Sequence, residues 1–304
     1  MKRILVLCVL MVAGCSGKEP ETAAAPEAPP AEAVLTRDMV AGAEVTGVVD
    51  STITLQAGRY EGPPIAAGGA ARATVTLWQP TILLGNLDGV PGVEAAALLS
   101  TNSGGSGEFV HLGVFGLRDG IVRSIAVAPV GDRTRLFRAW LEGKRVHMDV
   151  IEAGPGEPAC CPTQLTRKAF ELKEGKLQQV ENAAVGSLSI NLLAATDWML
   201  AEMDGEPLPE GALPPTALVQ YGKIAGFAGC NRYAAPVTEP EVGVIKVGQV
   251  TATGDKSCEP PALELEARFL ERLAQVRGYG FMAGQLVLHG PEADGAPRWL
   301  VFTR

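Results

Sequence analysis

A short stretch containing two glycines and a cysteine places the strongest constraint on how this chain folds. It reads Gly226-Phe227-Ala228-Gly229-Cys230-Asn231-Arg232-Tyr233, and its glycines allow backbone conformations that residues with a Cβ rarely adopt. Cys230-Asn231 is typical of a turn that ends a strand, which we expect to begin near Leu218. The stretch therefore predicts a strand, a tight turn and a thiol held at the turn.

A second cysteine, Cys258, precedes a segment with the pattern of an amphipathic helix over 260–277. Two prolines at its start suit the first helical turn, where no intrahelical N–H bond is lost. Glu264 stands four residues before Arg268, which is the favourable order for an ion pair on the polar face. The apolar face is formed at helical spacing by Ala262, Leu265, Phe269, Leu273 and Val276. A helix with this pattern packs on a sheet.

Together these segments resemble a META domain of the bacterial HslJ type. The resemblance covers about the last third of the chain and includes the helix and Cys258. It implies a small, mainly antiparallel fold with one packed helix, and a role in cell-envelope integrity or stress tolerance. The motif residues that carry it are Gly226, Phe227, Gly229, Cys230 and Asn231.

The amino terminus has the pattern of a lipoprotein signal. Two basic residues precede the apolar run 4–12, which is too short to remain as a membrane-spanning helix. The run ends at Ala13-Gly14-Cys15, which resembles the lipobox of bacterial lipoproteins and implies cleavage before Cys15 and acylation of that cysteine. The alternative is an ordinary signal peptide with an incidental cysteine.

The residues after Cys15 indicate where the anchor would be held. Ser16 stands where an aspartate would favour retention in the inner membrane, so we expect an outer-membrane anchor facing the periplasm. The segment 15–34 is rich in Ala, Pro and Glu and cannot bury enough apolar surface to order itself. We therefore expect residues 1–14 to be a signal peptide and 15–34 to be a tether.

The remaining sequence predicts a mainly β (α+β) protein with two domains. From 35 to 188, short apolar or alternating runs are separated by turn signals such as Arg118-Asp119-Gly120, Glu142-Gly143-Lys144 and Lys173-Glu174-Gly175-Lys176. This pattern predicts an antiparallel, hairpin-rich N-terminal domain. We expect the META-like domain over 189–304, with strands near 196–202, 217–225, 242–250, 277–282, 285–289 and 298–302.

Four thiols remain in the mature chain after cleavage and acylation, and four thiols allow three pairings. Separate domains favour Cys230 with Cys258, and Cys160 with Cys161. The first bond would contribute on the order of 3 kcal/mol by restricting the unfolded chain. The second would be a strained bond between adjacent residues, which could make the pair redox-active. A structural clip or two reduced thiols are the alternatives for Cys160 and Cys161.

Charge and composition exclude several classes of function. Removing Lys2 and Arg3 changes the formal net charge from −8 to −10, and no run of basic residues offers a surface for nucleic acid. The three histidines show no zinc-site spacing and Cys-x-x-Cys is absent, so we expect neither catalysis nor a bound metal or cofactor. The run Gly85–Glu94 resembles a degraded calcium loop, and a polar turn is the alternative.

We therefore expect a non-enzymatic envelope lipoprotein with a META domain, held at the membrane by its lipid. It would bind an unknown envelope protein or ligand through a sheet face or through the loop 226–233. Two alternatives remain: a small-ligand or calcium binder that uses the N-terminal domain, and a thiol-redox protein that uses Cys160 and Cys161.

Overall fold

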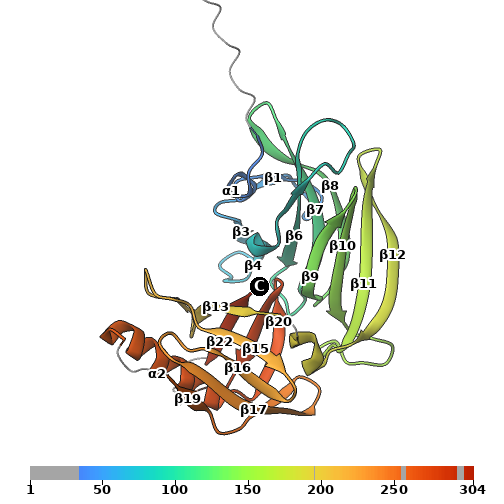
Figure 1. The fold of residues 1–304 in the computed structure, drawn as a ribbon. Helices are drawn as coiled ribbons and strands as arrows, with labels where there is room; N and C mark the ends of the chain where they lie inside the picture. The colour runs from blue at the N-terminus through green and yellow to red at the C-terminus, as the bar shows by residue number, and fades with distance from the viewer. Residues whose placement is uncertain (1–33, 195, 255–257, 293–297) are drawn as a thin grey trace, which may run out of the picture. The chain divides into compact units, whose positions relative to one another are not determined.

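The structure is a computed structural model that describes residues 34–194, 196–254, 258–292 and 298–304. Antiparallel strands dominate these described residues, and the two α-helices among them are the four-residue α1 and the long α2 (Figure 1). The prediction of a mainly β fold with a single packed helix is confirmed.

The first sheet is formed by the strands between residues 44 and 132. Its order is β2-β1-β8-β7-β6-β4-β3, with β5 paired to β6. Neighbouring strands are antiparallel except β1 and β8, which meet in parallel at a single residue pair. The elements are α1 (Arg37–Val40), β1 (Glu44–Val45), β2 (Ile53–Thr54), β3 (Arg59–Pro64), β4 (Arg72–Leu77), η1 (Gln79–Thr81), β5 (Leu83–Gly85), β6 (Glu94–Asn102), β7 (Phe109–Arg118) and β8 (Ile121–Asp132).

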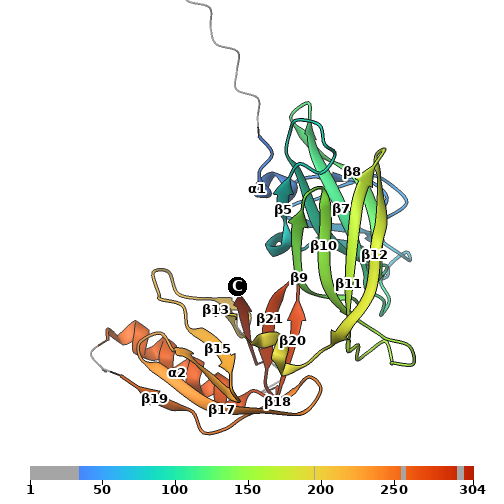
Figure 2. The same cartoon turned by 45° about the vertical axis from the view of Figure 1, so that its right-hand side comes forward.

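The second sheet is a meander in the order β12-β11-β10-β9 (Figure 2). Its strands are β9 (Arg135–Glu142), β10 (Arg145–Glu152), β11 (Gln164–Lys173) and β12 (Lys176–Ser187). The predicted turn between β11 and β12 is present, because Glu174 and Gly175 both have positive φ, at 50° and 72°. Two consecutive residues with positive φ match the right-handed twist of the strands that they join.

The two sheets pack against each other through a shared apolar core. Val114 of β7, Met148 of β10 and Phe170 of β11 are all at most 1% exposed and belong to one cluster of buried side chains. Alternate residues of an antiparallel strand point to one face, so each sheet contributes a row of apolar side chains. The region 35–188 therefore contains the hairpin-rich β structure that its sequence predicts.

The third sheet closes on itself. β13 pairs with β15 and also with β22, so the path β13-β15-β16-β17-β18-β20-β21-β22 forms a ring. The elements are η2 (Ile190–Leu193), β13 (Trp198–Met203), β14 (Glu206–Pro207), β15 (Thr216–Gln220), β16 (Lys223–Phe227), β17 (Arg232–Glu241), β18 (Val244–Val247), β19 (Thr251–Thr253), α2 (Pro260–Gln275), β20 (Gly278–Met282), β21 (Gln285–His289) and β22 (Trp299–Thr303). Closure satisfies the backbone groups that an open sheet leaves unpaired at its edges.

Helix α2 packs its apolar face onto this ring, as its sequence pattern predicts. Leu265, Phe269 and Leu273 are buried, and Phe269 is completely inaccessible to solvent. The Phe269 ring meets the rings of Tyr233 and Phe302 edge to face, at centroid distances of 5.3 and 6.5 Å. These edge-to-face contacts add to the free energy gained from burying the apolar surface.

The prediction of one strand over 217–225 is wrong. The chain reverses at Tyr221-Gly222, where φ is 51° and 69°, and forms the hairpin of β15 and β16. Tyr221 is a bulky residue in a left-handed conformation, which its sequence does not signal. A single glycine, Gly222, inside an apolar run is therefore not sufficient to predict the turn.

Strand β17 is also missing from the sequence-based prediction, although it pairs with β16, β18 and β19. Its buried residues alternate with exposed ones. However, Tyr233 is followed by two alanines, and the strand also contains two prolines. Alanine and proline are depleted in strands, so the alternation carried little signal.

Replacing Phe269 with alanine is expected to lower the free energy of unfolding by about 3–5 kcal/mol, because the side chain fills the interface between α2 and the ring. Chemical denaturation followed by circular dichroism measures this change. Glu264→Ala, on the exposed face of the same helix, is the control and is expected to change stability by less than about 0.5 kcal/mol. Equal effects of the two substitutions would contradict the described packing.

Candidate functional site

The two cysteines of the META motif lie at disulfide distance. The sulfurs of Cys230 and Cys258 are 1.99 Å apart and the Cα atoms are 6.0 Å apart. The bond links the turn after β16 to the residue two positions before α2. It therefore fastens the start of the helix to the wall of the ring, as expected for the pairing of these two thiols.

The other motif residues also contact neighbouring elements of the fold. Asn231 is 5% exposed, and its backbone N–H and its side-chain amide both donate to the carboxylate of Glu266 on α2.

The glycines of the motif are required by close packing. A Cβ at Gly226 would lie 2.1 Å from the carbonyl oxygen of Thr216, so only glycine fits there. Gly229 has φ 109° and lies against α2. Phe227 ends β16 and donates its N–H to the Thr216 hydroxyl. The motif therefore builds a corner of the fold.

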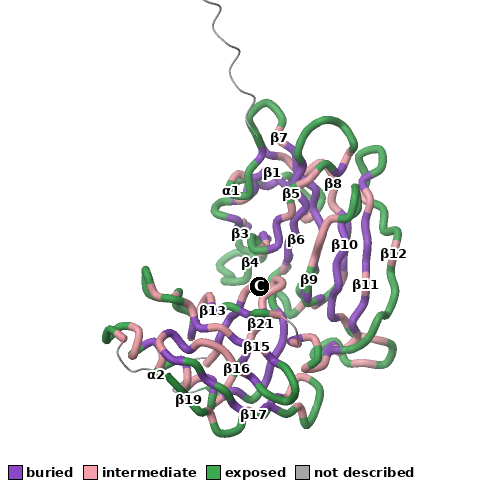
Figure 3. The backbone as a smooth tube through the Cα atoms, in the orientation of Figure 1, coloured by how far each residue is buried: buried purple, intermediate pink, exposed green. Residues whose placement is uncertain are grey.

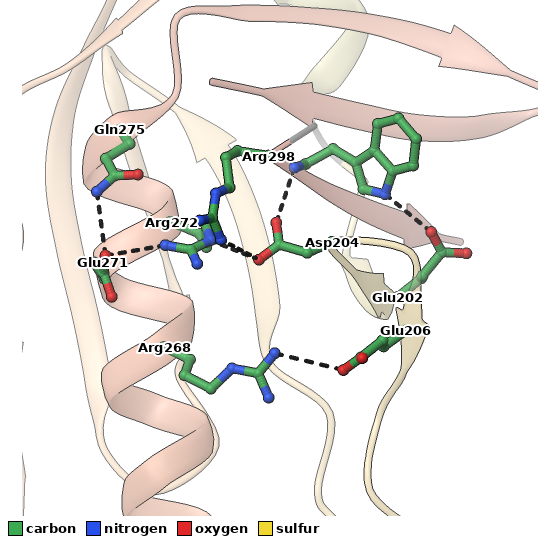
Figure 4. Close-up of polar contacts among 9 residues, drawn as sticks. Glu202, Asp204, Glu206, Arg268, Glu271, Arg272, Gln275 and Arg298 are labelled. Carbon is green, nitrogen blue, oxygen red and sulfur yellow. Dashed lines mark hydrogen bonds and ion pairs between the residues drawn. The ribbon is translucent and has the colours of Figure 1, made fainter. Parts of the chain in front are cut away.

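A cluster of charged residues joins α2 to the strands that close the ring (Figure 4). Asp204 follows β13 and accepts from Arg272 at 2.7 Å and from the Trp299 backbone N–H at 3.1 Å. Burial acts to lower the pKa of Arg272, but the hydrogen bond and charge of Asp204 raise it above its ordinary value. Asp204 therefore bridges the helix and β22 at the closure point.

The expected ion pair of Glu264 with Arg268 is not found among the described residues. Arg268 instead approaches the carboxylate of Glu206, at 3.9 Å, on the hairpin that follows β13 (Figure 4). Both side chains are largely exposed, so this pair contributes little to stability. The tertiary contact between α2 and β14 redirects Arg268 away from the helix surface.

Cys160 and Cys161 lie in the loop between β10 and β11 and are free thiols. Their sulfurs are 2.7 Å apart, longer than the covalent distance of about 2.05 Å, so the expected second disulfide is not formed. Adjacent Cα atoms are about 3.8 Å apart, whereas disulfide-bonded residues usually separate by at least about 4.4 Å. Both side chains are exposed to solvent.

Glu157 fastens the base of this cysteine loop. Its carboxylate accepts from the backbone N–H of Gly154 at 3.0 Å and of Thr163 at 2.9 Å, and also from the Thr163 hydroxyl. These hydrogen bonds, the Thr163 hydroxyl first, lower the pKa of Glu157 to about 2. The carboxylate therefore ties the two ends of the loop together while it is ionised.

The run Gly85–Glu94 forms a polar turn. The side-chain oxygens of Asn86 and Asp88 accept from the backbone N–H groups of Gly89 and Val90. The buried Glu94 carboxylate accepts from the Leu87 N–H at 2.8 Å. These oxygens therefore serve as acceptors for backbone N–H groups of the turn itself. Over the described residues, no group of three or more His, Cys, Asp or Glu side chains could hold a metal ion.

Strand β12 is the most exposed long strand of the second sheet (Figure 3). It pairs with β11, and no other strand of the described chain is hydrogen-bonded to it, although part of it lies beside β8 of the first sheet. Val180 and Val185 are 43% and 45% exposed, and the five residues 183–187 carry no charge. A long strand with one unpaired edge can accept a further strand from another polypeptide.

A cavity of about 700 Å³ lies beside η1, β9 and the strands β20–β22. Its lining includes four aromatic side chains and the polar residues Arg135 and His289. Burial and the charge of Arg135 lower the pKa of His289. Its size is within the range of small-molecule sites, although it is not confined to the N-terminal region. The aromatic residues are Trp78, Tyr279, Phe281 and Trp299.

Cys15, the signal peptide and most of the tether lie outside the described residues. The described part of the chain contains no helix that is long and apolar enough to span a bilayer. His111, His147 and His289 lie in β7, β10 and β21, as separate strand residues.

Comparison with known proteins identifies one region of the chain. Residues 191–301 match the family model described as "META domain", so the resemblance of the last third is confirmed. A solved structure titled "NMR structure of the protein from Burkholderia xenovorans" is 25% identical, with a TM-score of 0.30, and covers 38% of this chain and 84% of its own. No curated protein matches this chain.

Lowering the pH is expected to release the cysteine loop at unusually acidic values. Because the folded pKa of Glu157 is depressed from 4.5 to about 2, its contribution to stability is present above pH 4.5 and disappears as the pH falls through about 2. NMR titration of the Glu157 carboxyl carbon and of the Gly154 and Thr163 amides measures this midpoint. A midpoint near 4.5 at all three positions would show that the carboxylate does not hold the loop.

Proposed function

We propose that this chain is a non-enzymatic envelope lipoprotein, in which a lipid on Cys15 holds the META domain and the N-terminal sheets at a membrane. The observation that carries the proposal is the start of the sequence, where a basic and apolar segment ends at Ala13-Gly14-Cys15. The tether 15–34 would give the folded part reach from that membrane. Outer-membrane placement, facing the periplasm, follows from Ser16.

The cysteine chemistry supports export. Cys230 and Cys258 lie at disulfide distance, and disulfides persist in oxidising compartments such as the periplasm. A bond across these residues would stabilise the domain by on the order of 3 kcal/mol through loss of freedom in the unfolded chain.

The binding role is assigned to strand β12. The ring of the META domain is closed, whereas β12 presents an unpaired edge with exposed valines and an uncharged end. An extended segment of an envelope protein can add to this edge through backbone hydrogen bonds. The acidic mature chain makes nucleic acid and anionic lipid headgroups poor alternatives.

Metabolic labelling with a fatty acid analogue tests the anchor. The parent protein is expected to incorporate the label and to fractionate with the outer membrane, because several acyl chains bind a bilayer far more firmly than one. Cys15→Ser is expected to lose the label and the membrane association. Label retained by Cys15→Ser, or an unlabelled parent protein in the cytosol, would refute the anchor.

The same strains test the binding surface by photo-crosslinking in intact cells. A photoreactive residue at Val185 is expected to capture one defined envelope protein, and Val180→Lys is expected to abolish the adduct because a charge on an edge strand opposes pairing. A photoreactive residue at Tyr221, 98% exposed in the META domain, is the matched control. The same adduct from both positions, or an adduct indifferent to Val180→Lys, would exclude β12 as the binding edge.

A further inference from the structure

The cysteine loop is used neither by the anchor nor by the β12 edge. Its two thiols are adjacent in sequence, exposed, and 2.7 Å apart at their sulfurs. We propose that Cys160 and Cys161 form a chelating site for a soft, trivalent metalloid, with arsenic(III) as the class of ligand.

Ligand number and geometry select this class among thiophilic ions. Thiolates bind soft centres, but structural zinc requires four ligands. No third His, Cys, Asp or Glu accompanies the two thiols within the described residues. Copper(I) and mercury(II) favour two thiolates on opposite sides of the ion, which two neighbouring sulfurs do not offer. A pyramidal arsenic(III) centre takes two sulfurs on the same side and leaves its third position open to solvent.

The loop holds the two sulfurs on the same side before any ligand binds. Glu157 ties Gly154 to Thr163 at the base of the loop, and the Cys161 N–H donates to the Pro158 carbonyl at 3.1 Å in a tight turn. Proline also precedes and follows the cysteines, at 158 and 162, and restricts the backbone there. A preorganised pair loses less conformational freedom on binding than two thiols in a mobile chain.

Chelation exchanges oxygen ligands of the arsenic for the two sulfurs of the loop. In the chelation step, two As–O bonds break and two As–S bonds form, and both thiol protons leave on the oxygens as water. The oxidation state of arsenic does not change, so no oxidant or reductant is required.

Titration of the full-length protein carrying Cys8→Ser and Cys15→Ser with phenylarsine oxide tests the site, because those two thiols would otherwise also bind the reagent. The protein is first treated with a mild reductant, and peptide mapping establishes that Cys230 and Cys258 remain bonded. Intact-mass spectrometry is expected to show one arsenical per chain, and a thiol reagent is expected to find both Cys160 and Cys161 blocked. A small dithiol should reverse the binding, whereas a monothiol at the same concentration should not.

Single substitutions provide the controls, because each leaves one thiol in place. Cys160→Ser and Cys161→Ser are each expected to weaken binding about a hundredfold, since the second thiolate binds at high effective concentration. Both residues are exposed, and circular dichroism establishes that the variants are folded. The proposal would be overturned if the parent protein has two titratable thiols and does not bind the arsenical. It would also be overturned if either serine variant binds the arsenical as tightly as the parent does.

Discussion

The pairing of β13 with β22 is the contact on which the C-terminal structure depends. It joins residues about a hundred positions apart, with Leu200 opposite Phe302 and Met203 opposite Leu300. Without it, β13 and β22 would be the two open edges of a long twisted sheet. Asp204 reinforces the closure from outside by binding Arg272 of α2 and the backbone of Trp299. The helix and the disulfide then hold a ring that is already closed.

The residues of the META motif take part in this closed structure. The Gly226–Tyr233 loop is used to build the corner between β16, β17 and α2, so its glycines and Asn231 serve the fold. Exposed features outside this corner include the edge of β12 and the loop that carries Cys160 and Cys161. A closed META ring with an exposed strand edge elsewhere is compatible with the proposed tether and the proposed binding edge.

Much of this arrangement could be predicted from local sequence, because hairpin turns and amphipathic helices are local structures. The turn at Glu174-Gly175 and the buried face of α2 follow from residue type and spacing alone. The Tyr221-Gly222 reversal could not be predicted, since a tyrosine with positive φ is imposed by the pairing of β15 with β16. The role of Asp204 likewise depends on residues far away in the sequence. In β17, the alanines leave too small a difference in hydrophobicity between the buried and the exposed face to predict the strand.

Amide hydrogen exchange across β13 and β22 tests the closure of the ring most directly. If the two strands are paired, the amides of both strands should exchange only through global unfolding, at rates matching those of β20 and β21. The Asp204 N–H, which donates to the Trp299 carbonyl at 3.0 Å, should share that protection. Rapid exchange in β13 and β22, beside slow exchange in β20 and β21, would show that the sheet is open and would contradict this account.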